Sequence, residues 1–178
     1  MIEDSYTNEQ VLPEAIPQVE HLVFQDLERS YLKVSMILAS LFSLVFLAAA
    51  GFAIYTIHDE GKPQIFIYII VAVYLLIAGL LLFLSYKGYF MKAYALRQND
   101  IIYKSGYIWR SRIVIPFNRV QHCEINNGPI DRMFGLSSLK LYTAGGSSSD
   151  LTIPGLNPQM AQDLKDFIVR KTGLYEEE

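Results

Sequence analysis

The residues with the clearest chemical potential are cations in the second half of the chain. Arg110 and Arg112 lie two positions apart in a predicted strand, so both side chains project from one face of it. Lys104 precedes the adjacent turn, and Arg119 follows the same strand. Cations held near an anionic leaflet each contribute about 1 kcal/mol of attraction. Lys104, Arg110, Arg112 and Arg119 therefore form a candidate lipid-binding set.

A simpler interpretation of these cations needs no ligand. Arg110 and Arg112 would then form a solvated strand face, and Arg119 would pair locally with Glu124 or Asp131. We rank this interpretation above specific recognition of a lipid headgroup. We still expect some non-specific attraction of these cations to the membrane surface. The neighbouring aromatic residues Tyr107 and Trp109 are candidates for contact with the membrane interface or with a partner.

Residue types that support catalysis or metal binding are not arranged to do so in this sequence. His122 and Cys123 are adjacent, so in a strand their side chains diverge, and we expect a buried or half-buried structural Cys. His21 and His58 are too distant in sequence to complete a metal site with credible spacing. The Gly- and Ser-rich segment 144–150 lacks the Gly-Lys-Ser/Thr ending of a phosphate loop and is expected to be a hairpin loop. We expect a non-enzymatic protein without metal or cofactor.

The basic residues lie in a region of short β-type segments closed by one helix. The predicted strands cover residues 93–96, 101–105, 110–115, 120–125, 139–143 and 151–153, with a compact turn or single helical turn at 128–135. Asn157 as N-cap, Pro158 at the first position and Gly173 at the end delimit the helix. Its apolar face is Met160, Leu164, Phe167, Ile168 and the stem of Lys171. The prediction is a strongly bent, mainly antiparallel sheet capped by a C-terminal helix.

Two uncharged apolar runs precede this region. Residues 34–57 and 65–86 contain 24 and 22 residues without Asp, Glu, Lys, Arg or His. As helices they would be about 36 and 33 Å long, enough to cross a hydrocarbon core of about 30 Å. The alternative, two buried helices of a soluble protein, does not suit so short a chain. The loop 58–63 allows only a tight antiparallel hairpin.

Basic residues flank one end of this predicted hairpin. The membrane-flanking set is Arg29, Lys33, Lys87 and Lys92. The connecting loop offers only Lys62, beside Asp59 and Glu60. The positive-inside rule therefore predicts a multi-pass protein of the inner (plasma) membrane with both termini in the cytoplasm.

The predicted spans favour an anchor over a transport pathway, because neither carries an ionisable residue. Ser35, Ala39 and Ser43 recur at four-residue spacing, which permits close helix approach. We rank packing of this stripe on the second span above a contact between protein copies.

The first 33 residues are acidic, with a net charge of −5. From Gln18 onward, near-helical spacing of Val19, Leu22, Val23, Leu27 and Tyr31 predicts an amphipathic cytoplasmic helix that packs on the C-terminal domain. The expected organisation is an N-terminal segment at 1–33, a hairpin at 34–86 and a C-terminal domain at 87–178.

Four segments in order resemble the bacterial pleckstrin-homology-like (PH-like) domain of the YdbS-like membrane proteins. They are IPFNRVQ at 115–121, GPIDRMFGL at 128–136, LxLxTAG at 139–145 and IPGL at 153–156. The resemblance covers roughly residues 86–172, and the hairpin in front also suits that group. It implies a curved, barrel-like sheet capped by a C-terminal helix, and no established enzyme activity.

These observations favour a PH-like adaptor held at the inner leaflet by a two-helix anchor. Its partners would be the lipid bilayer and another membrane protein or a second copy of itself, bound through sheet edges, the N-terminal helix or the hairpin. The alternative is an anionic-lipid headgroup module that uses the basic strand face. A net charge of −3 disfavours nucleic acid as a partner.

Overall fold

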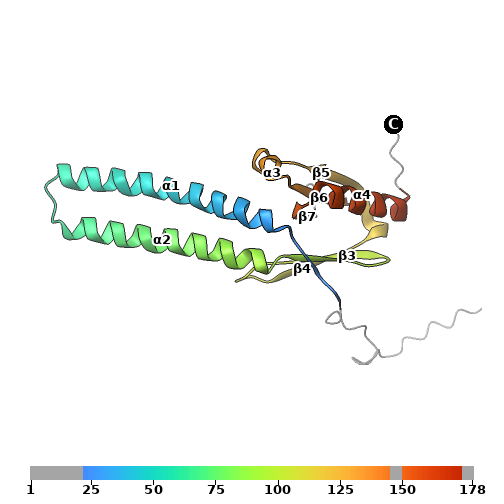
Figure 1. Cartoon of the computed structure of the whole chain (residues 1–178). Coiled ribbons are helices and arrows are strands. Elements are labelled where there is room, and N and C mark those ends of the chain that lie inside the picture. The colour runs from blue at the N-terminus through green and yellow to red at the C-terminus, as the bar shows by residue number, and fades with distance from the viewer. Residues whose placement is uncertain (1–21, 145–149, 174–178) are drawn as a thin grey trace, which may run out of the picture.

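The computed structural model describes residues 22–144 and 150–173. Two long helices, α1 (Arg29–Asp59) and α2 (Ile65–Phe90), lie side by side as an antiparallel hairpin and extend away from a domain of sheets (Figure 1). Their lengths of about 46 and 39 Å exceed a hydrocarbon core of about 30 Å. In the most apolar 18-residue stretch of α1, 6% of the residues are buried, and in that of α2 none are buried. Neither helix is therefore the core helix of a soluble domain.

Both helices are longer than the apolar runs that predicted them. α1 begins at Arg29 instead of residue 34, and α2 continues to Phe90 instead of ending at residue 86. Arg29, Lys33 and Lys87 therefore lie within the end turns of the helices, and Arg and Lys are good helix formers that allow α1 and α2 to continue beyond the uncharged segments.

The two helices are joined by hydrogen bonds near the end of the hairpin that adjoins the domain. The Ser85 hydroxyl donates to the Ser35 carbonyl at 2.9 Å, and the two hydroxyl oxygens are 2.8 Å apart. Ala39, one turn further along α1, is buried. The predicted small-residue stripe thus packs on α2 over Ser35 and Ala39, whereas the Ser43 hydroxyl bonds the Ser40 carbonyl within α1.

The predicted strands are all present, and they are divided between two antiparallel sheets. The first sheet has the order β1 (Gln25–Asp26), β2 (Ala93–Leu96), β3 (Asp100–Ser105), β4 (Ser111–Pro116). The second has the order β5 (Val120–Asn126), β6 (Ser137–Thr143), β7 (Leu151–Leu156). A 3-10 turn, η3 (Phe117–Arg119), connects them, and α3 (Pro129–Met133) is the predicted single helical turn between β5 and β6.

The C-terminal helix α4 (Pro158–Thr172) covers the second sheet and begins and ends as predicted. The Asn157 side chain accepts from the Gln159 amide at 3.0 Å, and Gly173 ends the helix with φ 71°. Its buried residues are Ala161, Leu164 and Ile168. The predicted apolar face is rotated slightly, because Ala161 faces the core while Met160 remains 39% exposed.

The core lies between the two sheets and α4. Its fully buried side chains include Ile101 of the first sheet, Leu139, Leu141 and Ile153 of the second, and Ile168 of α4. Burial of each such side chain contributes roughly 1.5–3 kcal/mol, so this cluster holds the three layers together.

The N-terminal segment differs from its prediction. Residues 25–26 form β1 instead of a helix, with Gln25 opposite Tyr94 and Asp26 opposite Ala93. Leu27 is buried in the core, and the Glu28 amide donates to the Gly155 carbonyl at 2.9 Å. The predicted amphipathic helix is therefore wrong over residues 22–28, because the open edge of β2 offers hydrogen-bond partners that helical periodicity cannot reveal; residues 18–21 lie outside the described part of the chain.

The start of α1 is packed tightly on the second sheet. Gly155 of β7 has φ +64°, and a Cβ there would lie 2.5 Å from Tyr31 Cγ. Lys92, just after α2, donates to the Tyr31 hydroxyl at 3.0 Å, and the Tyr89 hydroxyl donates to the Leu27 carbonyl at 3.0 Å. The hairpin is thus fastened directly to the domain.

Candidate functional site: a basic cleft at the base of the hairpin

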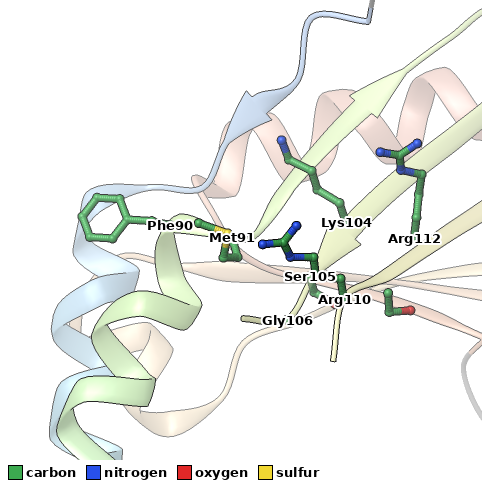
Figure 2. A pocket seen from close by; sticks show the side chains of 8 residues that line it. Phe90, Met91, Lys104, Ser105, Gly106, Arg110 and Arg112 are labelled. Atoms are coloured by element: carbon green, nitrogen blue, oxygen red, sulfur yellow. The ribbon is translucent and has the colours of Figure 1, made fainter. Parts of the chain in front are cut away.

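An open cleft of about 590 Å³ lies where the β3–β4 hairpin meets the end of α2. Its lining residues come from the end of α2 and the residue after it, from β3 and β4, and from the turn between these strands: Phe90, Met91, Lys104, Ser105, Gly106, Arg110, Ser111 and Arg112. In Figure 2, Lys104 and Arg112 extend from the strands in the same direction, and Arg110 extends toward Met91. Three of the four predicted lipid-binding residues therefore lie together.

The strand register places like charges opposite each other. Lys104 is the direct cross-strand partner of Arg112, and Ser105 is opposite Ser111. Like charges in this arrangement are destabilising. Among the described residues, no carboxylate lies within 4.0 Å of Lys104, Arg110 or Arg112, since the two ion pairs found there join Lys62 to Glu60 and Arg97 to Asp100. The cleft therefore concentrates positive charge that a bound anion would neutralise.

Local structure fixes the positions of these cations. The Lys104 ammonium lies 4.2 Å from the centroid of the Phe24 ring, a cation–π contact with the N-terminal segment. Gly106 has φ +93°, and a Cβ there would lie 1.8 Å from the Trp109 carbonyl oxygen. Only glycine permits this turn, which returns the chain so that Arg110 and Arg112 face Lys104. The cleft can bind phosphate-type anions through guanidinium and ammonium donors.

Arg119, the fourth predicted residue, lies outside the cleft. It belongs to η3, at the opposite end of β4, and its side chain is exposed. Neither Glu124 nor Asp131 forms an ion pair with it within the described ranges; the Glu124 carboxylate instead accepts a hydrogen bond from the Tyr142 hydroxyl at 2.9 Å. The predicted local pairing of Arg119 is therefore not found.

The membrane-flanking cations lie at the same end of the hairpin as the cleft. Arg29 and Lys33 are exposed on the first turns of α1, and Lys87 is half-buried in the last turn of α2. Lys92 is turned inward, with its ammonium 4.8 Å from the Tyr31 ring centroid. Positive charge thus collects where the helices enter the domain.

Cys123 is structural, as the sequence predicted. Its side chain is 6% exposed, and burial raises the pKa of the thiol from 9.0 to about 12, against a smaller lowering by Lys165. The thiol is therefore protonated at neutral pH and is a poor nucleophile. His122 is exposed and lies beside Tyr142, and residues 22–144 and 150–173 contain no group of three His, Cys, Asp or Glu side chains that could hold a metal ion.

Several residues of the cleft were not predicted. Phe90, the last residue of α2, and Met91, which follows it, line the cleft, and Phe24 of the N-terminal segment contacts the cleft residue Lys104. They are 13 or more positions from Lys104 in sequence, and no spacing rule connects them to a strand. The only available signal was that the β-region begins directly after the second span, which leaves the end of that helix close to the first strands.

The family model described as "Bacterial PH domain" matches residues 22–172. The chain belongs to the bacterial PH domain family. The match begins at residue 22, so it includes the segment that forms β1 and both long helices as well as the later strands. The resemblance drawn from residues 86–172 is confirmed and extends further toward the N-terminus than the motifs alone indicated.

A relative of this bacterial PH domain protein carries a membrane description. The protein named "UPF0699 transmembrane protein YdbS" from Bacillus subtilis (strain 168) is 32% identical over 77 residues. The aligned part is 43% of this chain and 46% of the relative, so the chain spans less than half the length of that protein. No solved structure matches. Together with the two exposed apolar helices, these findings identify a membrane protein with a bacterial PH domain.

Proposed function

We propose that the PH domain of this membrane protein binds the headgroups of anionic lipids in the cleft between β3, β4 and the end of α2. The observation that carries the proposal is the direct opposition of Lys104 and Arg112, with Arg110 on the same face and no described carboxylate near them. Cations scattered singly on a surface do not repel each other strongly. Two cations directly opposite each other on neighbouring strands lower the stability of the fold unless an anion is bound between them.

The expected gain is sufficient to select lipids by charge. Three cations at about 1 kcal/mol each would contribute about 3 kcal/mol, which corresponds to roughly a hundredfold preference for an anionic over a zwitterionic headgroup. Because the cleft is open, added salt should weaken this preference.

We propose that both helices span the inner (plasma) membrane and that both termini lie in the cytoplasm. Arg29, Lys33 and Lys87 at the domain end of the hairpin support this orientation, whereas Lys62 in the connecting loop is paired with Glu60. The cleft would then face the inner leaflet, where anionic headgroups are attracted to basic residues.

We also propose a binding role without catalysis. This is supported by the protonated, buried Cys123 and by the uncharged segments 34–57 and 65–86 of the two helices. A transporter would need ionisable groups facing a cavity within the spans.

Headgroup binding is tested on the full-length protein in a zwitterionic detergent. The protein is titrated with dioctanoyl phosphatidylglycerol, with dioctanoyl phosphatidylcholine as the neutral lipid, and binding is followed by thermophoresis. The triple variant Lys104→Gln, Arg110→Gln, Arg112→Gln should bind the anionic lipid at least tenfold more weakly than the unmodified chain.

A matched variant controls for net charge. Arg119→Gln, Arg170→Gln and Lys171→Gln remove the same three charges from exposed positions outside the cleft, and binding should stay within twofold. Equal losses in the two triple variants would contradict a specific site. Competition by inorganic phosphate at the concentration of the lipid would indicate a soluble phosphate compound instead.

A second candidate function is protein assembly, and the edge of the first sheet favours it. β4 is the outermost strand of its sheet, and Val114 on it is 47% exposed. An open strand edge can pair with a strand of a partner. A photo-crosslinking residue at position 114 in intact membranes should then capture one partner or a second copy, and a position on α4 such as Gln162 should capture neither.

A further inference from the structure

We propose that the tip of the β3–β4 turn, formed by Tyr107, Ile108 and Trp109, inserts into the interface of the bilayer that holds the hairpin. These side chains are 38%, 62% and 87% exposed. Three consecutive large apolar or aromatic residues on one turn are an unusual use of surface in a soluble domain. The tip would give the domain a membrane contact in addition to the two helices, independently of whether the cleft binds a headgroup.

The position of the tip beside α2 identifies the bilayer as its partner. The ring centroids of Tyr107 and Phe83 are 6.0 Å apart in an edge-to-face arrangement with an interplanar angle of 83°. Phe83 lies seven residues before the end of α2, about 10 Å back along the helix axis, and within the uncharged run 65–86. Tyr107 therefore reaches a part of α2 whose surface belongs to lipid.

Figure 1 shows the turn between β3 and β4 beside the domain end of α2. The helix surface there is apolar, since Phe83 is itself 48% exposed. The tip packs against this part of α2, so the lipid that covers the helix at the membrane boundary also covers the tip. Trp and Tyr are favoured at this boundary, where one side of the ring meets acyl chains and the polar atom meets water.

The residue types around the tip match the layers of an interface. Ile108 and Trp109 are the outermost apolar side chains, and Arg110 follows directly at the edge of the basic cleft. In this order the apolar residues at the tip would lie among the acyl chains, and the cations next to them would lie among the lipid headgroups.

A second apolar protrusion lies on the other side of the hairpin. The short helix α3 lies beside the domain end of α1 (Figure 1) and contacts it. Met133 at the end of α3 is 82% exposed. The hairpin thus emerges between the aromatic tip and a short helix that exposes one methionine, an arrangement that suits a domain resting on the membrane surface.

Trp109 is the only tryptophan in the sequence, so its fluorescence reports on the tip directly. The full-length protein is reconstituted into vesicles of phosphatidylcholine alone, which separates insertion of the tip from any preference for anionic headgroups. We expect blue-shifted emission, at least twofold quenching when the lipid carries bromine atoms near the carboxyl end of its acyl chains, and weak quenching by aqueous acrylamide.

A relocated tryptophan provides the matched control. In the variant Trp109→Phe, Lys171→Trp, the reporter lies near the end of α4 that is farthest from the hairpin (Figure 1), and acrylamide should quench it while brominated lipid does not. Emission of Trp109 like that of the control would overturn the proposal. Blue-shifted emission without quenching by brominated lipid would also overturn it, because the tip would then be covered by protein.

Discussion

At Gly155, a strand of the domain and the first turn of a long helix approach so closely that no side chain fits between them. The contact with Tyr31 combines with φ +64°, a conformation that costs other residues about 1–2 kcal/mol. Gly135 has nearly the same backbone conformation, φ +63°, but nothing lies within 4 Å of the position of its Cβ. Comparing substitutions at the two glycines therefore distinguishes the cost of a positive φ, present at both, from the cost of the clash with Tyr31, present only at Gly155.

We predict that Gly155→Ala lowers the free energy of unfolding by about 2–5 kcal/mol, because a clash of about 1–3 kcal/mol is added to the conformational cost of about 1–2 kcal/mol. Gly135→Ala should cost only about 1–2 kcal/mol. Urea unfolding of the detergent-solubilised protein, followed by circular dichroism, measures both. Equal losses would show that Tyr31 moves aside without cost.

Cys123 should make the protein more sensitive to alkali. The unfolded thiol ionises near pH 9, whereas burial holds the pKa of the folded thiol at about 12. Its contribution to stability is complete below pH 9 and is lost as the pH rises from 9 toward 12. Between pH 8 and pH 11 the unmodified chain should lose more stability than Cys123→Ala, which still contains the buried tyrosines. The same loss in both proteins would contradict this expectation.

Among the elements of the fold, the short segment before α1 contacts both sheets. β1 contains only two residues, yet it extends the first sheet, and the next two residues contribute a core side chain at Leu27 and a hydrogen bond from Glu28 to Gly155 in the second sheet. The segment therefore connects both sheets to the start of the hairpin.

Leu27→Ala should destabilise the protein by about 2–5 kcal/mol, the usual cost of truncating a buried leucine. Val23→Ala, four residues earlier in the same segment, should change stability by less than about 0.5 kcal/mol because Val23 is 88% exposed. Thermal unfolding in detergent distinguishes the two. A small effect of Leu27→Ala would mean that the segment is not part of the cooperative fold.

What the sequence predicted well was local. The uncharged runs, the Asn157 cap with Pro158, and the turns around the strands each depend on neighbouring residues, and the helices and strands formed close to their predicted bounds. The division into two sheets and the pairing of Gln25 with Tyr94 depend on residues far apart in the chain.

The candidate site follows the same rule. Arg110 and Arg112 share a strand face by their spacing, and Lys104 joins them through a tight turn, so their proximity could be predicted. Arg119 was grouped with them because it is near in sequence, but η3 places it at the other end of β4. The contributions of Phe90 and Phe24 come from tertiary packing, which no residue spacing predicts; the short distance in sequence from the second span to the first strand is a signal for Phe90 alone.

At the scale of the whole molecule, the orientation of the hairpin is open to direct test. In a Cys123→Ala background, Lys62→Cys places a thiol in the loop between the helices, and Gln162→Cys places one on the exposed face of α4. A membrane-impermeant maleimide applied to intact cells should label position 62, and it should label position 162 only after the cells are opened. The reverse pattern would contradict the proposed topology.

The hairpin is inserted within the PH domain, between β1 and β2, which are neighbours in the first sheet. During synthesis on the ribosome, β1 emerges before the membrane segments and its partner strand only after them. The domain therefore cannot close until the chain has passed through the whole hairpin and returned. Correct integration of the helices becomes a precondition for maturation of the domain, and a protein that fails at the first step presents an unfinished sheet to cellular quality control.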